Sequence, residues 1–486
     1  MDHLKILDSA IADGPYADDW ASLAAFTPPA WLRAAKLGIF IHWGVYSVPA
    51  YAHEWYPRNM YIQGSHEFEH HVKTYGAHKQ FGYRDFIPMF TAEKFDPGAW
   101  AELFREAGAR YVVPVAEHHD GFQMYRSALS RWNAFEMGPG RDTLGELLAE
   151  CDKRGLTRCL SSHRAEHWWF LGHGRQFDSG IGEPERGDLY WPSMPEAKLQ
   201  DIYGEPAPSE EFITDWLRRC VELVENYRPR LVYFDWWVKH SAFKPSLRRF
   251  IAYYYNRAAQ WGFAPAVAFK DDALPLTCGV PDMERGGWRD AKPFLWQACT
   301  STARNSWCYT EQNVYKTPAE VVQNLIDVVS KNGVLLLNVG PKADGTVPEQ
   351  DETILRTLGR WLKTNGEAVY GASPWRTSSE GVTSNDGGGF SEKELDYTHE
   401  DIRFTIKNGK IYAAVMRCPP DGRVTVRSLG GLREDGNHNF GGVITGVRLL
   451  GFEDSPLTWR VDGEGLRAEF RGVKSDLPVV LEVTTG

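Results

Sequence analysis

The sequence predicts an α/β fold, a closed (β/α)8 barrel of the TIM type followed by a small antiparallel β-sandwich. Three observations lead to this prediction. Amphipathic helical segments alternate with short apolar strands through most of the 486 residues. Several of those strands end in a histidine, an aspartate or a lysine. Towards the C-terminus the pattern changes to short strands separated by turn residues.

The alternation of helix and strand begins near the N-terminus, where residues 34–47 supply a buried strand. Residues 96–109 then have apolar residues at helical spacing, and residues 110–122 continue as a β-branched strand. The same pair recurs at residues 143–155 with 156–169, 209–226 with 230–237, 246–262 with 263–272, and 317–333 with 334–345. Helices that alternate with buried strands indicate a parallel sheet covered by helices.

An open, doubly wound sheet is the alternative to a barrel. The strand ends favour the barrel, because its site is built at the C-terminal ends of many different strands. No G-x-G-x-x-G follows the first strand, which weakens a dinucleotide-binding fold. We therefore expect a catalytic barrel within residues 1–370, its strands and helices running from about residue 20, and a second domain at residues 371–486.

The C-terminal part is expected to be a β-sandwich of about a hundred residues. A Gly/Ser-rich stretch at residues 366–396 is interpreted as a boundary or a flexible loop. Beyond it, Asn408-Gly409 is a strong signal for a two-residue hairpin turn.

Charge and composition narrow the class of protein. A net charge of −10 argues against nucleic acid or an anionic membrane as the main partner. The first twenty residues have neither a basic start nor a long apolar run, so we expect no signal peptide and no membrane anchor. Seven scattered cysteines make no disulfide framework, which predicts a reduced, cytoplasmic protein. The oligomeric state is left open, with a homo-oligomer as one option.

Asp235 is the strongest candidate for a nucleophile. It follows an apolar strand and precedes Trp236 and Trp237, and a carboxylate among rings is costly to desolvate unless it is paired or useful. Glycoside cleavage needs a second carboxyl group, and Glu284 supplies one in what is expected to be a Gly-rich loop. For Glu284 the alternative is a solvated loop charge.

The adjacent His118 and His119 are candidates for hydrogen bonding at the barrel mouth. Neighbouring side chains on a strand point to opposite faces, so both reach one pocket only if the pleat breaks, for which Asp120-Gly121 is a plausible place. A catalytic metal is the rival interpretation, although two adjacent histidines are poor joint ligands for one ion.

Further polar and aromatic candidates stand in three other segments. His42 ends the first strand. In the loop that follows, Glu54 could accept hydrogen bonds from sugar hydroxyls, and the indole N–H of Trp55 could donate one. The alternative for Glu54 is a surface ion pair. Trp307 is expected either in the pocket wall or in the core.

These segments together resemble glycoside hydrolase family 29, the retaining α-L-fucosidases. The resemblance covers most of residues 31–370 and is carried by KLGIFIHWGVYSVPAY, EWY, EHHDGF, PRLVYFD, NSWCY and NGVLLLNVGPKADGTVPE. It implies a retaining exo-α-L-fucosidase without a cofactor or a metal, acting on a fucosylated oligosaccharide or glycoconjugate. It also implies Asp235 as the nucleophile and Glu284 as the general acid/base.

The resemblance further implies the residues that bind the sugar. Those matching the hydroxyl-binding positions are His42, Glu54, Trp55, His118 and His119, and those matching the aromatic wall are Tyr233 and Trp307. His163 and Lys270 complete the expected set, with Lys270 standing where an arginine is common. Trp236 and Trp237 replace a small residue, so they are expected to bear on the leaving group. A glycosidase acting on α-L-galactosides and a fucose-binding protein without turnover are the alternatives.

Overall fold

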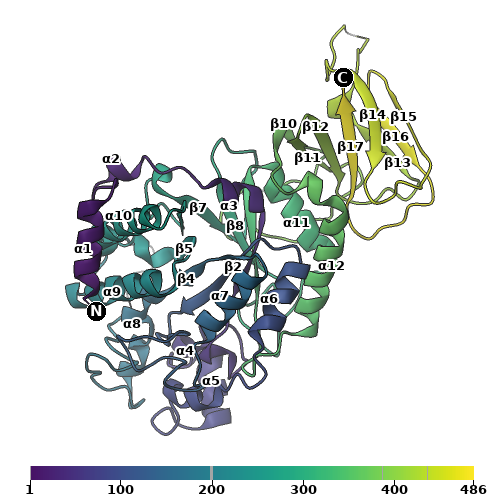
Figure 1. The fold of residues 1–486 in the computed structure, drawn as a ribbon. Helices are drawn as coiled ribbons and strands as arrows, with labels where there is room; N and C mark the ends of the chain where they lie inside the picture. The colour runs from purple at the N-terminus through teal and green to yellow at the C-terminus, as the bar shows by residue number, and fades with distance from the viewer. Residues whose placement is uncertain (1, 197–200, 386, 435) are drawn as a thin grey trace.

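The computed structural model describes residues 2–196, 201–385, 387–434 and 436–486, which form a barrel with a β-rich part attached to one side (Figure 1). The barrel has parallel strands β1 (Leu37–Ile41), β2 (Tyr111–Glu117), β4 (Leu160–Ser162), β5 (Leu231–Phe234), β6 (Ala266–Phe269), β7 (Val280–Glu284), β8 (Trp296–Ser301) and β9 (Gly333–Val339). It closes because β1 pairs with both β9 and β2. The short β3 (Thr157–Arg158) directly precedes β4 and also pairs with β2. The predicted fold class is confirmed.

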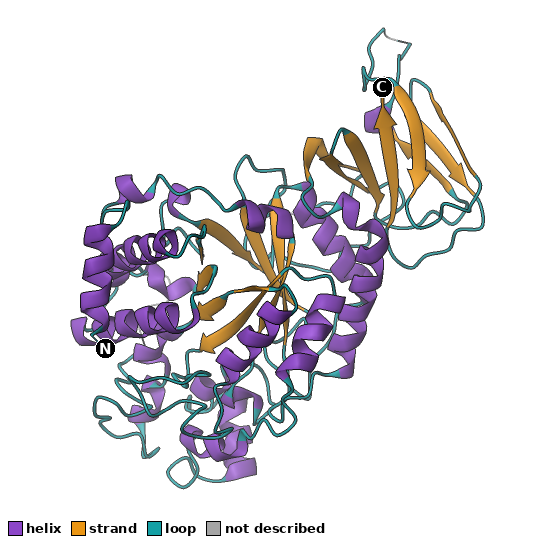
Figure 2. Cartoon of the chain, viewed as in Figure 1, coloured by secondary structure: helices purple, strands orange, loops and turns teal. Residues whose placement is uncertain are grey.

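Helices surround the strands (Figure 2). The outer layer comprises α6 (Pro97–Glu106), α7 (Thr143–Lys153), α9 (Glu210–Tyr227), α10 (Lys244–Gln260), α11 (Pro318–Ser330) and α12 (Glu349–Asn365). The N-terminal helices are α1 (His3–Asp13), α2 (Trp20–Leu23) and α3 (Ala30–Ala35), and the connections after β1 and β4 contain α4 (Tyr56–Asn59), α5 (His66–Tyr75) and α8 (His167–Phe170).

Local sequence explains where the outer helices begin. The Asp96 side chain accepts from the amide of Ala99 at the start of α6. Thr317 and Glu320 form a capping box at the start of α11, with Pro318 in the first turn. Strands β1, β2, β5, β6, β8 and β9 are buried at every residue, as expected of strands covered on both faces.

Two connections of the barrel depart from the regular alternation. Residues 270–279 and 285–295, both fully described, contain a short 3-10 turn (Leu276–Cys278) and no α-helix. Both stretches contain proline and glycine, which disfavour a helix interior. The prediction of a loop around Glu284 is wrong, because Val280–Glu284 form β7 and Glu284 is its last residue.

The C-terminal part consists of two antiparallel sheets. One contains β10 (Ser373–Glu380), β11 (Ile402–Lys407), β12 (Lys410–Val415), β17 (Val479–Thr485) and β14 (Ile444–Leu449), and the other contains β13 (Arg423–Val426), β16 (Leu466–Phe470) and β15 (Leu457–Val461). Asn408 and Gly409 both have positive φ and join β11 to β12, as predicted. The domain boundary at residue 370 stays a prediction.

The stretch of residues 366–396 is not a free linker. It contains β10 and then part of the segment of residues 381–401, here called the β10–β11 loop, which returns to the barrel. There the amide of Phe390 donates to the carbonyl of Glu284 at 2.8 Å. Among the described residues, no helix is both long and apolar enough to cross a membrane.

A buried ion pair also joins the two parts. Asp327 of α11 accepts from Arg403 of β11 at 2.6 Å and from Lys331 at 2.7 Å, and both cationic side chains are almost fully buried. Burial opposes the charge on Asp327, but the two cations outweigh burial and lower the pKa of Asp327.

We expect Asp327→Ala to lower the free energy of unfolding by about 3–5 kcal/mol, because it leaves two buried cations without their carboxylate. Urea denaturation at neutral pH measures this. Because the folded-state pKa of Asp327 is lowered, its contribution is present above the unfolded value of about 4 and is lost as pH falls. The control is Asp396→Ala, which removes an exposed pair with Arg417 and should cost at most about 1 kcal/mol. Equal effects of the two variants would contradict the expectation.

Candidate active site

A cavity of about 400 Å³ opens at the C-terminal ends of the barrel strands, in the size range of small-molecule sites. Every site residue predicted from the sequence lines it: His42, Glu54, Trp55, His118, His119, His163, Tyr233, Asp235, Lys270, Glu284 and Trp307. Phe40, Trp236, Lys239, Asp271, Asp282, Met283, Gly389 and Phe390 complete the lining. Their roles in catalysis or binding stay predictions at this point.

The barrel itself brings these side chains together. His42, His118, His163, Asp235 and Lys270 each follow directly after the last residue of a strand, namely β1, β2, β4, β5 and β6. Parallel strands present these ends at one rim, so residues more than 200 positions apart become neighbours. Strand β2 ends at Glu117, which is earlier than the break expected at Asp120-Gly121. His118 and His119 therefore lie beyond the regular strand, and both line the cavity.

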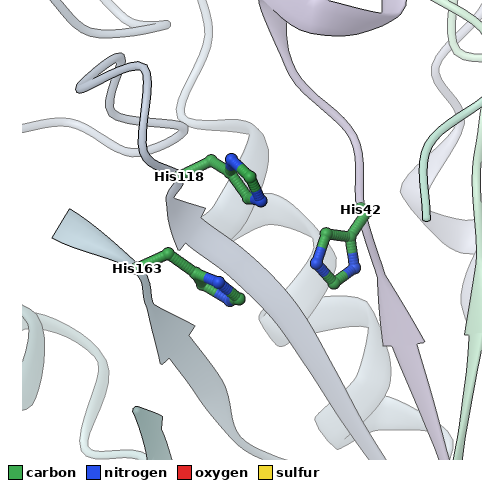
Figure 3. A group of neighbouring side chains, drawn as sticks. All are labelled: His42, His118 and His163. Atoms are coloured by element: carbon green, nitrogen blue, oxygen red, sulfur yellow. The ribbon is translucent and has the colours of Figure 1, made fainter. Parts of the chain in front are cut away.

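His42, His118 and His163 converge from three different strands (Figure 3). The ring of His42 is held by Asn338 of β9, whose Oδ1 lies 2.7 Å from His42 Nδ1. The Asn338 amide nitrogen donates to Ser301 and to the carbonyl of Trp307, so Oδ1 is the acceptor and His42 carries its proton on Nδ1. The Nε2 lone pair of His42 is thereby left as an acceptor.

One ammonium group joins the two candidate carboxylates. Lys270 Nζ donates to Asp235 Oδ1 at 2.7 Å and also to Glu284 Oε2. The facing oxygens of Asp235 and Glu284 therefore lie within roughly 6 Å of each other, twice the length of a hydrogen bond. The other oxygen of Asp235 accepts from His163 Nδ1 at 3.2 Å, and His163 Nε2 lies within hydrogen-bonding distance of the Ser161 hydroxyl, at 3.1 Å.

Burial and charge set the two carboxyl groups apart. For Asp235, burial disfavours the charged form, but the Lys270 ammonium and the His163 hydrogen bond outweigh it and hold its pKa well below the ordinary value. For Glu284, burial together with the charge of Asp235 raises the pKa despite Lys270. A pair of carboxyl groups whose pKa values are pushed apart is suited to one ionised and one protonated role.

The imidazoles are kept neutral by burial. Burial lowers the pKa of His42 and of His118 well below its ordinary value, and that of His119 to about 3. His118 lines the cavity, and its buried Nδ1 has no hydrogen-bond partner among the described residues. Neutral imidazoles with free nitrogen atoms are suited to hydrogen bonds with uncharged hydroxyl groups.

Glu166 is a residue of the site that sequence reasoning missed. Its carboxyl group is fully buried behind His119, whose Nδ1 it contacts, and His119 Nε2 lies 3.4 Å from Asp235 Oδ2. Burial, and then the charge of Asp235, raise the pKa of Glu166 well above the ordinary value. A neutral, protonated Glu166 fits such a position. The spacing of Glu166 three residues after His163 was the available signal.

The predicted loop residues are held by backbone contacts across the cavity. Glu54 accepts from the amide of Trp307 at 2.9 Å, so its carboxylate is built into the wall and is not a surface ion pair. The Trp55 ring lies against His119, with ring centroids 5.6 Å apart. Tyr233 and Trp307 both pack on Phe40 at the cavity floor, which gives this side an aromatic surface.

The two tryptophans after Asp235 lie in different places. Trp236 is partly buried and lines the cavity. Trp237 is fully buried and packs against Trp169 and His240, so it belongs to the core. The expectation that both bear on the leaving group is therefore supported in position for Trp236 only.

By donor type, two groups among the described residues could hold a metal ion. They are His42, His118 and His163, and His119, His163 and Asp235, each with ligand atoms within 4.8 Å of one another. The first group combines histidines from three strands, which the adjacent pair in the sequence does not reveal. Both nitrogens of His163 already have partners, so a metal would have to displace Ser161 or Asp235.

Comparisons with known proteins agree on one family. Residues 4–367 match the family model described as alpha-L-fucosidase. The chain is similar to tissue alpha-L-fucosidase of Rattus norvegicus, with 31% identity over 86% of this chain and 82% of that protein. It is similar to the crystal structure of Thermotoga maritima alpha-fucosidase in complex with fucose, with a TM-score of 0.74, 30% identity, and 96% and 100% of the two chains covered. The structure of that enzyme with a mechanism-based inhibitor matches with a TM-score of 0.74, 29% identity and the same coverage.

We expect Lys270→Gln to raise the pKa of Asp235 by about one to three pH units, because the variant loses the cation that offsets the effect of burial. Infrared titration of the carboxyl bands, with isotope-labelled aspartate, measures this. Lys239→Gln is the matched control, since Lys239 lines the same cavity but pairs with Asp271. An unchanged aspartate titration in Lys270→Gln would show that the ammonium does not set the charge of Asp235.

Proposed function

The chain belongs to the alpha-L-fucosidase family and is a glycoside hydrolase, and from this we propose that it removes terminal α-L-fucose from fucosylated oligosaccharides or glycoconjugates with retention of configuration. The observation that carries the proposal is the pair of carboxyl groups, Asp235 and Glu284, which share the Lys270 ammonium in a cavity lined by histidines and aromatic rings.

The separation of the carboxyl groups supports the retaining mechanism. Retaining enzymes place them about 5–5.5 Å apart, whereas inverting enzymes need about 6.5–9.5 Å to admit a water molecule. The shared ammonium keeps the facing oxygens within roughly 6 Å. A direct attack by one carboxylate therefore suits the site better than attack by an interposed water.

In the first step, the Asp235 carboxylate attacks the anomeric carbon of fucose. The bond to the leaving oxygen breaks, and Glu284 donates its proton to that oxygen, so the leaving group departs as an alcohol. The lowered pKa of Asp235 keeps the nucleophile ionised, and the raised pKa of Glu284 supplies the proton. In the second step, Glu284 takes a proton from water, which attacks the same carbon and releases Asp235.

The remaining predicted residues hold the sugar. The neutral imidazoles of His42, His118 and His119, with Glu54 and the indole of Trp55, can bind the fucose hydroxyls. Tyr233 and Trp307 supply an aromatic surface for the methyl group of fucose. That surface leaves the extra hydroxyl of an α-L-galactoside without a partner. His163 and Lys270 act on Asp235, which both contact.

We expect Asp235→Gly to lower kcat/KM for 4-nitrophenyl α-L-fucoside by about 10⁴-fold or more, because the variant has no nucleophile. Added azide can enter the space left by the carboxylate and attack from the same side, giving β-L-fucosyl azide. Chromatography and NMR of the product measure this.

The control for the nucleophile is Asp272→Gly, which removes an exposed carboxylate two residues after Lys270. It should keep parental turnover and form no azide product. Undiminished hydrolysis by Asp235→Gly would refute its role. If the parent enzyme hydrolyses 4-nitrophenyl α-L-galactoside faster than the α-L-fucoside, its substrate is an α-L-galactoside and not an α-L-fucoside.

We expect kcat/KM of the parent enzyme to have a bell-shaped pH profile. Asp235 must be ionised, and its lowered pKa places the loss of activity on the acid side below the ordinary aspartate value of about 3.9. Glu284 must be protonated, and its raised pKa places the alkaline loss above the ordinary glutamate value of about 4.3. Initial rates across a pH series measure both limbs.

Glu284→Ala separates the acid role from the rest of the site. It should lower kcat/KM by about 10²–10⁴-fold for a fucoside with a poor leaving group and far less for a 2,4-dinitrophenyl fucoside. The alkaline limb of the profile should also disappear. Equal losses on both substrates would assign the acid/base role to another group.

A further inference from the structure

The C-terminal part of the chain contributes to the wall of the active-site cavity. Gly389 and Phe390, in the β10–β11 loop, line it together with residues from the barrel. Phe390 lies more than 100 positions after Glu284, in the stretch that the sequence suggested was a boundary or a flexible loop.

This loop is fastened to the strand that carries Glu284. The amide of Phe390 donates to the Glu284 carbonyl at 2.8 Å, and that of Gly388 donates to the Gly287 carbonyl at 2.8 Å. Gly287 and Gly388 form an antiparallel bridge. At Gly286 a Cβ would lie 2.0 Å from the Gly388 carbonyl oxygen, so the close approach of the two backbones requires glycine there.

A partly buried polar anchor holds the other side of the loop. The Glu392 carboxylate accepts from the Thr300 hydroxyl at 2.8 Å, from Lys316 Nζ at 2.7 Å and from the Asn324 amide at 3.2 Å. Its own amide donates to the Arg285 carbonyl at 2.7 Å. Phe390 is therefore placed by bonds on both sides of it.

The side chain of Phe390 is nevertheless unusually open. It is 73% exposed, and its φ of +53° is a left-handed conformation that costs a phenylalanine free energy. Backbone strain of this kind is found at ligand contacts, and here it places an exposed aromatic ring in the cavity lining.

Other residues that line the same cavity have side chains suited to contact with a second sugar. Trp236 and Met283 add apolar surface. Lys239 Nζ lies 5.0 Å from the centroid of the Trp236 ring and pairs with Asp271 at 2.8 Å, which provides a donor and an acceptor for hydroxyl groups. Apolar rings with a few polar groups are the usual composition of such a site.

We propose that Phe390, Trp236 and Met283, with the Lys239–Asp271 pair, form the subsite for a pyranose ring that carries the fucose. The inference rests on the proposed function, since Glu284 protonates the oxygen that joins the two sugars and Phe390 is bonded to the backbone of Glu284. The apolar face of the second ring stacks on the aromatic side chains, and its hydroxyls bind the ion pair.

Three substrates separate this subsite from the catalytic groups. α-L-Fucosyl fluoride needs neither a proton from Glu284 nor a second ring, methyl α-L-fucoside needs the proton only, and a fucosyl disaccharide needs both. The disaccharide is the one that the parent hydrolyses fastest among the 1→2, 1→3, 1→4 and 1→6 isomers with galactose or N-acetylglucosamine.

We expect Phe390→Ala to lower kcat/KM for the disaccharide about five- to tenfold, mainly through KM, and to change that for the fluoride and the methyl fucoside less than twofold. Phe390→Tyr, which keeps the ring, should have the parental kcat/KM for the disaccharide. The control is Val382→Ala on the same loop, where the side chain is 85% exposed and outside the cavity; it should match the parent on all three substrates.

Two results would overturn the subsite. Equal losses on the methyl fucoside and the disaccharide would mean that the loop only positions Glu284, and an unchanged rate on the disaccharide would mean that Phe390 contacts no second sugar. A parent that cleaves the fluoride but none of the disaccharides would also overturn it while leaving the proposed function intact. A parent inactive on the fluoride would instead count against the proposed function.

Discussion

The site depends on one buried cation between two carboxyl groups. Without Lys270, burial and mutual repulsion would favour protonation of at least one of Asp235 and Glu284. The ammonium and His163 are both placed on Asp235, whereas Glu284 shares only the ammonium. This asymmetry gives one carboxyl group a lowered pKa and the other a raised pKa.

The closed barrel lowers the free-energy cost of burying these charges, because rigid strand ends hold them at hydrogen-bonding distance before any ligand binds. His42, His118, His163, Asp235 and Lys270 each stand one residue beyond a strand. A second layer fixes them, with Asn338 behind His42 and Glu166 behind His119. Neutral imidazoles then suit hydrogen bonds to an uncharged sugar.

The C-terminal part is joined to this site rather than merely attached to the barrel. The Asp327–Arg403 pair connects α11 to β11, and the β10–β11 loop continues the pairing beyond β7. The backbone of Phe390 thus links the C-terminal part to Glu284 by a direct hydrogen bond. Glu284, the proposed acid/base, and the proposed second sugar site therefore share one support.

The sequence by itself determined the barrel, the hairpin at Asn408-Gly409 and eleven of the residues that line the cavity, because strand ends and turn residues are local patterns and the family motifs are specific. Only the tertiary structure decided that Glu284 ends a strand, that Trp237 belongs to the core while Trp236 lines the cavity, and that Glu166, Asn338 and Phe390 join the site. Those facts depend on contacts between distant segments, such as the bond from Phe390 to Glu284. Local sequence patterns carry no information about which distant backbone groups will meet.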